Sequence, residues 1–305
     1  MSKRLFDIGE FGLINLIKKE VRNRLSGVIN GIGDDAAVVT VSGSKKRLLL
    51  TSDMLIEGVH FTKDMQPERI GHKAIACSIS DIAAMGGLPR YALISIGVSA
   101  SEDVRFLRRI YKGILNTAEQ YGISIVGGDT VRHNKFVINI SLIGEGCDKE
   151  LVRRAGASVS DKIFVTGPLG RAFQSGWHLR FQPRIEEARY LVKKFKPTAM
   201  IDISDGLVAD LWHICKESGV SAVIWEESIP KRYGANINHA LYDGEDFELL
   251  FTLSVDNASR LKKDTKHRFS FYEMGEITQK NRDRICILDT KGRKKTIEIK
   301  GYKHF

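Results

Sequence analysis

The spacing of apolar residues changes repeatedly along the first half of the chain. Phe11, Ile14 and Ile17 recur at helical intervals and predict an amphipathic helix over residues 10–24. Further on, short β-rich runs alternate with longer segments of helical spacing, and this alternation favours a layered α/β domain. Strands are expected at 36–41, 47–55, 91–98 and 135–144, and helices at 67–87 and 101–122.

The alternation restarts after a break at residues 147–154. Each half then has the size of a common domain, and no low-complexity linker separates the two. We therefore expect two tightly packed domains, at residues 1–148 and 149–305. In the second domain, strands are expected at 161–167, 222–227 and 248–253, and helices at 185–195 and 206–218.

The composition is that of a globular protein, with 43% hydrophobic and 28% charged residues. No apolar run approaches the ~18 residues that span a bilayer, and no secretory signal follows the basic start, so we expect a cytoplasmic protein without a membrane partner. The cysteines lie far apart without a CxxC pair, which argues against zinc or a disulfide framework. We expect incidental thiols at Cys77, Cys147, Cys215 and Cys286.

The net charge of +10 comes mostly from residues 258–305, which hold 14 Lys and Arg against six Asp and Glu. Such a region is typical either of a nucleic-acid contact or of a solvated basic face. Its basic clusters resemble turns between short strands and lack interleaved aromatic residues. The solvated face is therefore favoured, and no nucleic-acid partner is expected.

Six aspartates stand apart because they end apolar runs or adjoin glycines, with few cationic neighbours in sequence. An unpaired carboxylate in an apolar setting is costly and needs cations or hydrogen bonds. Several of them together predict a shared divalent-cation cluster, and carboxylates with hydroxyls suit Mg²⁺ better than zinc. The alternative, helix caps or turn residues, stays open for Asp35 and Asp205. The six are Asp34, Asp53, Asp81, Asp129, Asp202 and Asp205.

The two common nucleotide cradles, GxxxxGK[ST] and a kinase-like GxGxxG with a strand lysine, are absent from the sequence. The Gly-rich stretch at 165–170 follows a predicted strand. It either cradles phosphate or is a plain turn, and the sequence favours neither.

Ten motifs in order, running from residue 9 to 305, closely resemble the thiamine-monophosphate kinase family. This family shares its fold superfamily with aminoimidazole ribonucleotide synthetase, selenophosphate synthetase and the hydrogenase-maturation dehydratase. The motifs are GEFGLI (9–14), GIGDDAAV (31–38), TSDMLIEGVHF (51–61), SDIAAMGG (80–87), GGDT (127–130), RRAGA (153–157), FVTGPLG (164–170), IDISDGLVADL (201–211), GEDFELLF (244–251) and GYKHF (301–305).

The resemblance implies a two-domain aminoimidazole ribonucleotide synthetase-like fold of α/β (α+β) class. The N-terminal domain would hold a mixed sheet with dimer-forming strands, and the C-terminal domain would be α/β. It implies a homodimer that phosphorylates thiamine monophosphate to thiamine diphosphate with ATP, the last step of thiamine diphosphate biosynthesis. The γ-phosphate would pass in line to the acceptor phosphate with several Mg²⁺ ions per site.

The resemblance also assigns roles to individual residues. Asp53, Asp129 and Asp205 would be catalytic. ATP would meet Tyr111, Gly128, Asp129, Arg153 and Ser204, and the acceptor substrate would meet His60, Glu245 and Tyr302. The metal ligands would be Asp34, Thr51, Ser52, Asp53, Asp81, Asp129, Asp202 and Asp205.

Three departures from the family pattern concern the site. Ser52 replaces the usual threonine but keeps the hydroxyl, Asp243 replaces a glycine, and the segment 229–241 is short, which changes the expected shape of the substrate pocket. Two alternative functions remain: another ATP-dependent synthetase of the same fold, and a basic RNA-binding or scaffold protein. A selenophosphate synthetase would carry a reactive cysteine or selenocysteine in a Gly-rich N-terminal segment, and this sequence has none.

Overall fold

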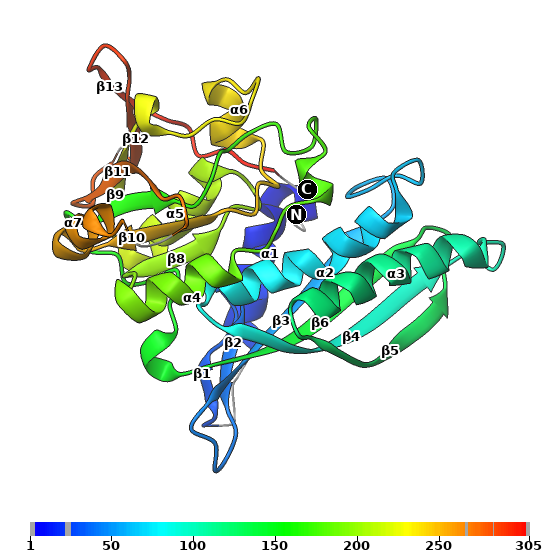
Figure 1. The fold of residues 1–305 in the computed structure, drawn as a ribbon. Helices are drawn as coiled ribbons and strands as arrows, with labels where there is room; N and C mark the ends of the chain where they lie inside the picture. The colour runs from blue at the N-terminus through cyan, green and yellow to red at the C-terminus, as the bar shows by residue number, and fades with distance from the viewer. Residues whose placement is uncertain (1–3, 22–25, 266–267, 283, 303–305) are drawn as a thin grey trace.

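The computed structural model describes residues 4–21, 26–265, 268–282 and 284–302, which form two β-sheets with helices packed between and around them (Figure 1). The first sheet has the order β1-β2-β3-β6-β4-β5 and is antiparallel except for the β4–β5 pair. Its strands are β1 (Val28–Asn30), β2 (Ala37–Thr40), β3 (Arg47–Ile56), β4 (Leu88–Val98), β5 (Ser124–Arg132) and β6 (Val137–Gly146), with helices α1 (Leu5–Glu20), α2 (Pro67–Ala84) and α3 (Val104–Gln120).

The second sheet has the order β13-β12-β9-β11-β7-β10-β8, with β12 and β9 parallel and the other pairs antiparallel. Short 3₁₀ turns lie at Asp148–Glu150, Trp177–Leu179 and Glu226–Ser228. The strands are β7 (Lys162–Val165), β8 (Ala199–Asp202), β9 (Ser221–Trp225), β10 (Leu249–Leu253), β11 (Tyr272–Thr278), β12 (Ile285–Leu288) and β13 (Lys294–Thr296), with helices α4 (Ile185–Lys194), α5 (Leu207–Ser218), α6 (Ile237–Tyr242) and α7 (Val255–Lys263).

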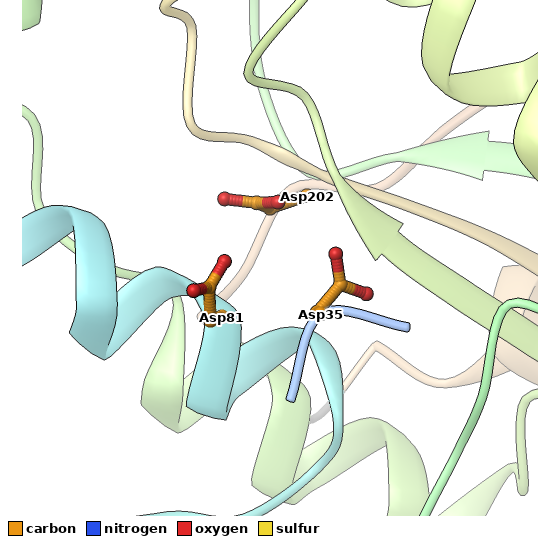
Figure 2. Close-up of side chains that lie close together, drawn as sticks. All are labelled: Asp35, Asp81 and Asp202. Carbon is orange, nitrogen blue, oxygen red and sulfur yellow. The ribbon is translucent and has the colours of Figure 1, made fainter. Parts of the chain in front are cut away.

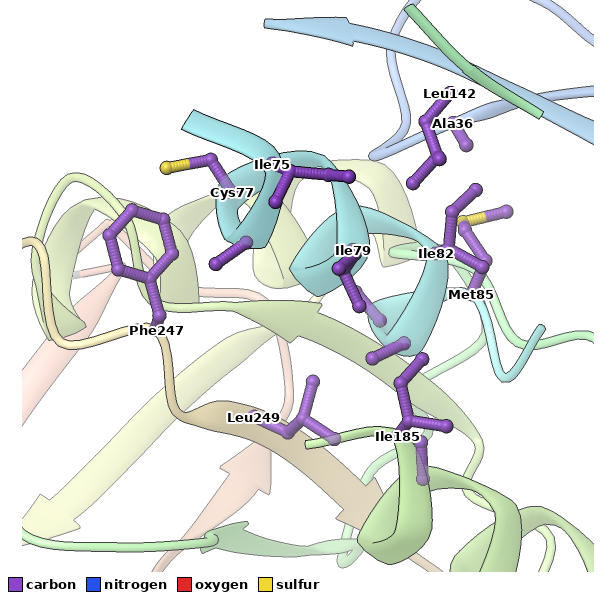
Figure 3. Packing of buried hydrophobic residues seen from close by; sticks show 14 of the residues in the cluster. Ala36, Ile75, Cys77, Ile79, Ile82, Met85, Leu142, Ile185, Phe247 and Leu249 are labelled. Atoms are coloured by element: carbon purple, nitrogen blue, oxygen red, sulfur yellow. The ribbon is translucent and has the colours of Figure 1, made fainter. Parts of the chain in front are cut away.

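Helix α2 is the centre of the molecule because it is apolar on nearly all sides. Ile75, Ile79 and Ile82 are fully buried, and Figure 3 shows them between Leu142 of the first sheet and Leu249 of the second. A helix that is hydrophobic all round must be covered on every side, so both halves pack against α2. Side chains carried by α2 therefore hold a fixed position relative to both sheets.

Two glycines set the close packing of α3 on α2. A Cβ atom at Gly71 would come within 2.0 Å of the Ile110 carbonyl oxygen, and one at Gly113 within 1.9 Å of the Glu68 carbonyl oxygen. No side chain is tolerated at either position, since such contacts overlap the van der Waals radii. The α2–α3 layer covers one face of the first sheet (Figure 1).

The predicted strands and helices are confirmed, with differences at their ends. The opening element α1 is broken at Gly9, whose φ of 64° is not helical, so its longer part begins at Glu10 as predicted and ends at Glu20; residues 22–24 of the prediction lie outside the described residues. Helix α3 begins at Val104, later than the predicted residue 101, and is capped by Asp103, whose side chain accepts from the Arg105 N–H at 2.8 Å. The GGDT motif, expected at the end of an apolar run, lies inside strand β5.

Several composition-based expectations also have a structural counterpart. Cys77, Cys215 and Cys286 are buried thiols, whereas Cys147 is exposed. Among the helices that the structure describes, none combines the length and apolar character needed to cross a membrane. Part of the basic C-terminal region is paired at the surface: Lys262 contacts Glu273 at 2.7 Å, and two cations contact Asp289.

Candidate active site

A cleft of about 640 Å³ lies between the two halves of the molecule. Helix α1 contributes Phe11 and Lys18 to its wall, and the ring of Phe11 packs on His213 of α5 with centroids 4.4 Å apart. Nine of the site residues expected from the sequence line this cleft, although they are spread from residue 34 to residue 302. They are Asp34, Thr51, Ser52, Asp53, His60, Ser204, Asp205, Glu245 and Tyr302.

Three carboxylates converge beside the cleft, as Figure 2 shows. Asp35 precedes β2, Asp81 lies in the last turn of α2, and Asp202 ends β8. One oxygen of each lies within 4.8 Å of the others, and the side chains of Asp35 and Asp202 are buried. The three ligands thus come from a loop, a helix and a strand, and from both halves of the chain.

Hydroxyl groups fix the orientation of these acids. Because side chains alternate along a strand, Thr51 and Asp53 of β3 both face helix α2. The Thr51 hydroxyl donates to Asp81, and Ser78 of α2 donates to Asp53 at 2.6 Å. Ser80 donates to Asp202 at 2.6 Å. Each acid of the group Asp53, Asp81 and Asp202 therefore has one oxygen held in place by a neighbouring hydroxyl.

Burial and mutual repulsion disfavour negative charge on these acids. Burial raises the pKa of Asp202 to about 7, and the nearby Asp35 adds to this effect. The pKa of Asp81 is raised well above its usual range by burial and by the charges of Asp53 and Asp202, and burial likewise raises the pKa of Asp53. Two carboxylates that share a small site cannot both ionise without a compensating cation. The cluster therefore requires either protons or a cation.

The donor set fits a hard divalent cation. The Asp35 carboxylate pairs through Oδ1 with Arg154 at 2.6 Å, while its Oδ2 is buried and, among the described residues, has no hydrogen-bond partner. A buried unpaired carboxylate oxygen is costly unless a ligand engages it. Oxygen ligands from three aspartates are those that Mg²⁺ prefers, and His or Cys ligands are not among the three.

Asp34, the residue that the sequence placed in the cluster, is engaged differently from Asp35. It accepts from Asn30 at 2.9 Å and from the backbone N–H of Arg154 at 3.2 Å. Burial, followed by the charge of Asp35, raises its pKa to about 6. Asp34 therefore connects the loop before β2 to the backbone of Arg154. Asp35 is the member of the pair that lies close to Asp81 and Asp202. The caps or turn role left open for Asp35 does not describe this arrangement.

Besides Asp81 and Asp202, which lie beside the cleft, four expected site residues do not line it. Gly128 and Asp129 lie on the edge strand β5, where Asp129 is exposed and pairs in register with Ser95. A Cβ atom at Gly128 would come within 1.7 Å of the Ile94 carbonyl oxygen, so the glycine is required by strand packing. Tyr111 is half-buried on α3, and Arg153 is exposed, whereas its neighbour Arg154 lines the cleft.

The end of the cleft near His60, Glu245 and Tyr302 is built by the C-terminal half and by α2. His60 accepts the Ile56 N–H at Nδ1, 3.0 Å away, so its neutral ring carries the proton on Nε2. Glu245 receives two hydrogen bonds from the Lys73 ammonium, which the sequence analysis did not single out. The Tyr302 N–H donates to the Asp205 carbonyl at 2.9 Å and so places the end of the described chain at the cleft.

The Gly-rich stretch at 165–170 forms a packed turn outside the lining of the cleft. The Gly170 N–H donates to both oxygens of Asp246 at 3.0 Å, and a Cβ atom at Gly167 would overlap the carboxylate of Glu248. Acidic neighbours repel phosphate, so the structure favours the plain turn.

The comparisons with known proteins agree with this architecture. Models of the AIR synthase related proteins match the chain in two parts, the N-terminal domain at residues 33–145 and the C-terminal domain at residues 139–287. The thiamine-monophosphate kinase of Aquifex aeolicus is 37% identical over 331 aligned positions, which cover 99% of this chain and 100% of that protein. That of Bacillus subtilis is 33% identical and covers 97% and 99%.

Solved structures give the same grouping. One described as AaThiL complexed with AMPPCP and TMP has a TM-score of 0.86 and 35% identity, with all of both chains covered. The hydrogenase maturation protein HypE in complex with ATP, at 19% identity, 96% coverage of each chain and a TM-score of 0.69, shares the fold. With full-length relatives above 30% identity, the chain belongs to the thiamine-monophosphate kinase family of phosphotransferases.

Proposed function

We propose that this protein transfers the γ-phosphate of ATP directly to the phosphate of thiamine monophosphate in the cleft between its halves. The convergence of Asp35, Asp81 and Asp202 beside that cleft is the observation that carries the proposal. Phosphoryl transfer depends mainly on positioning and on neutralising the phosphate charge. The acceptor phosphate already bears a nucleophilic oxygen, so no general base is needed from the protein.

Asp35, Asp81 and Asp202 would hold Mg²⁺, with Asp53 and Asp205 adjoining them from the cleft wall. Bound there, such ions would supply positive charge to neutralise the transferred phosphoryl group. The protein fixes its ligands in advance: the hydroxyls of Ser78 and Ser80 orient Asp53 and Asp202. Arg154 lines the cleft with its guanidinium against Asp35, so we assign to it the contact with ATP phosphates that the motif gave to Arg153.

The acceptor would bind in the part of the cleft lined by His60, Glu245 and Tyr302. There His60 presents its Nε2–H as a donor, Glu245 presents carboxylate oxygens, and Tyr302 presents an aromatic ring at the wall. A donor, an acceptor and a ring suit the amino group, ring nitrogens and flat heterocycles of thiamine. These residues would therefore decide which phosphate ester is accepted.

The uncovered face of the first sheet supports a homodimer joined through that sheet. Large apolar side chains of β3, β4 and β5 are exposed, among them Met54, Tyr91 and Leu93. A row of exposed apolar side chains is typical of a protein–protein interface. Asp129 lies on the same face, since its register partner Ser95 alternates with the buried Ile94 and Ile96. Gly128 and Asp129 do not line the cleft of their own chain, so the ATP contact expected of them would be made at the cleft of a second copy.

The remaining expectations fit this role. An enzyme completing thiamine diphosphate biosynthesis would work in the cytoplasm, and its ion-paired basic region gives no reason to add a nucleic-acid partner. We keep the division of the chain at residues 148 and 149, since β6 of the first sheet ends at Gly146.

The decisive experiment supplies purified protein with ATP, Mg²⁺ and thiamine monophosphate and measures thiamine diphosphate by chromatography. Diphosphate should form only with all three present. Parallel reactions offer free thiamine or an aminoimidazole precursor as acceptor. Turnover of either of these, without thiamine diphosphate formation, would overturn the proposal in favour of another enzyme of the same fold.

A further inference from the structure

Lys73 is a buried cation that no role described so far requires. Its side chain is only 1% exposed, although it belongs to a residue type that is almost never fully buried without a partner. It lies on α2 at the wall of the cleft, eight residues before Asp81. Burial of an ammonium group is expensive, so its surroundings must supply matching acceptors.

Those acceptors are the two groups to which the acceptor substrate is assigned. The Lys73 Nζ donates to Glu245 Oε1 at 2.7 Å, to Glu245 Oε2 at 2.6 Å and to the His60 carbonyl oxygen at 3.0 Å. An ammonium has three N–H donors, and all three are used. One buried side chain therefore ties a loop of the first half to a loop of the second.

Glu245 needs such a tie because its own backbone does not favour the observed conformation. Its φ angle is +55°, in the left-handed region, and its N–H donates to the Ser204 carbonyl oxygen at 2.7 Å. Non-glycine residues persist there only where the surroundings fix them, often at functional sites. Its side chain is 27% exposed and would otherwise turn toward water.

We propose that Lys73 is a positioning residue for the acceptor substrate, which it aligns with the metal centre through Glu245 and His60. Asp81 and Lys73 share one helix that is buried on all sides, and eight residues separate them by about 12 Å along its axis. The helix thus sets the distance between the carboxylate cluster and the carboxylate that meets the substrate. This inference rests on the proposed function of Glu245 and His60.

The experiment compares Lys73→Met, Glu245→Gln and the double variant with the unaltered enzyme. Initial rates are measured with thiamine monophosphate varied at saturating ATP and Mg²⁺, and then with ATP varied. Lys73→Met should raise the KM for thiamine monophosphate on the order of 10- to 100-fold, the value of one oriented hydrogen bond to a charged group, and leave the KM for ATP unchanged. In the Glu245→Gln background it should add little, since both changes act through one group.

Arg189→Met is the matched control. Arg189 also links the two halves, through the Gly86 carbonyl oxygen at 2.6 Å and Glu150 at 2.5 Å, and the Glu150 side chain is 28% exposed. It lies outside the cleft lining, so the variant should lower Tm and change neither KM. If Lys73→Met lowers Tm without changing either KM, as expected for Arg189→Met, or raises both KM values equally, then Lys73 only stabilises the packing of the two halves and the inference is overturned.

The remaining outcomes separate this inference from the proposed function. If Glu245→Gln leaves the KM for thiamine monophosphate unchanged, the substrate assignment of Glu245 fails, and the inference fails with it. If Lys73→Met does not fold, the double variant buries no unpaired charge and takes its place. The inference is supported if the double variant and Glu245→Gln have the same KM for thiamine monophosphate. It is overturned if the KM of the double variant is higher than that of Glu245→Gln by the full factor expected for Lys73→Met.

Discussion

Replacing Asp35 and Asp34 separately by asparagine tests whether the cation site is the one that the structure builds. The ion pair of Asp35 with Arg154 at 2.6 Å is worth about 6 kcal/mol at an effective dielectric constant of 20. In the metal-free protein below about pH 7, Asp81 and Asp202 keep protons, so their repulsion of Asp35 does not offset this attraction. Removing one partner of a buried ion pair costs about 3–5 kcal/mol, so Asp35→Asn should lower the free energy of unfolding of the metal-free protein by about that amount.

The Asp35→Asn substitution should also lower the affinity for the cation strongly. Loss of a residue that merely orients a metal ligand costs 10- to 100-fold in affinity or activity, so loss of a direct ligand should cost about 100-fold or more. Asp34→Asn should cost far less, because an amide oxygen still accepts the Arg154 N–H that Asp34 accepts now. Its stability loss should stay near 1 kcal/mol, the value of an ordinary hydrogen bond.

Mg²⁺ titrations of kinase activity give the apparent affinity, and thermal unfolding with EDTA or Mg²⁺ gives the stability of each form. Asp35→Asn should unfold below the wild-type temperature in EDTA, because it loses the ion pair with Arg154, and it should lose the Mg²⁺-dependent rise. If Asp34→Asn is the more damaging variant at saturating Mg²⁺ while both remain folded, the site built around Asp35 is wrong.

Three further outcomes are expected. Asp53→Asn should reduce kcat/KM by more than about 100-fold with an unchanged circular dichroism spectrum, since Asp53 adjoins the cluster in a fixed orientation; near-normal rates would contradict its role. In EDTA, the free energy of unfolding should fall as pH rises from about 4 to about 7, because folded Asp202 keeps a proton that the unfolded chain has released. Tm measured across this pH range should fall less for Asp202→Asn than for the unaltered protein, and an equal fall in both proteins would refute this. Leu93→Glu, on the open face of the first sheet, should give monomers by light scattering and lose activity, whereas an active dimer would exclude this interface.

The elements of the fold were predictable because they depend on local periodicity. The long apolar segment of α2 and the strand runs of both halves are visible without any knowledge of the partners that cover them. The ends were less predictable. Asp103 caps α3 where Ser101 also carries a suitable side chain, and the choice depends on where the preceding loop enters the helix.

The site was located to the right motifs, and the structure adds a neighbour to two of the predicted residues. Asp35 lines the cleft beside Asp34, and Arg154 lines it next to the exposed Arg153. Only the position of α2 and β8 brings Asp35 close to Asp81 and Asp202. Lys73 was missed for a different reason, since 172 residues separate it from Glu245 and nothing local marks the pair.

The division of the cluster between the two halves links cation binding to their relative position. Asp35 and Asp81 are fixed to the first sheet and to α2, whereas Asp202 ends β8 in the second sheet. Without a cation their repulsion opposes the packing of the halves; with one, the same three charges pull them together. Since α2 also carries Lys73, which holds Glu245 of the second half, the metal end and the substrate end of the cleft depend on one helix. Cation binding should therefore raise the affinity for the acceptor substrate, as a consequence of where these five residues are attached.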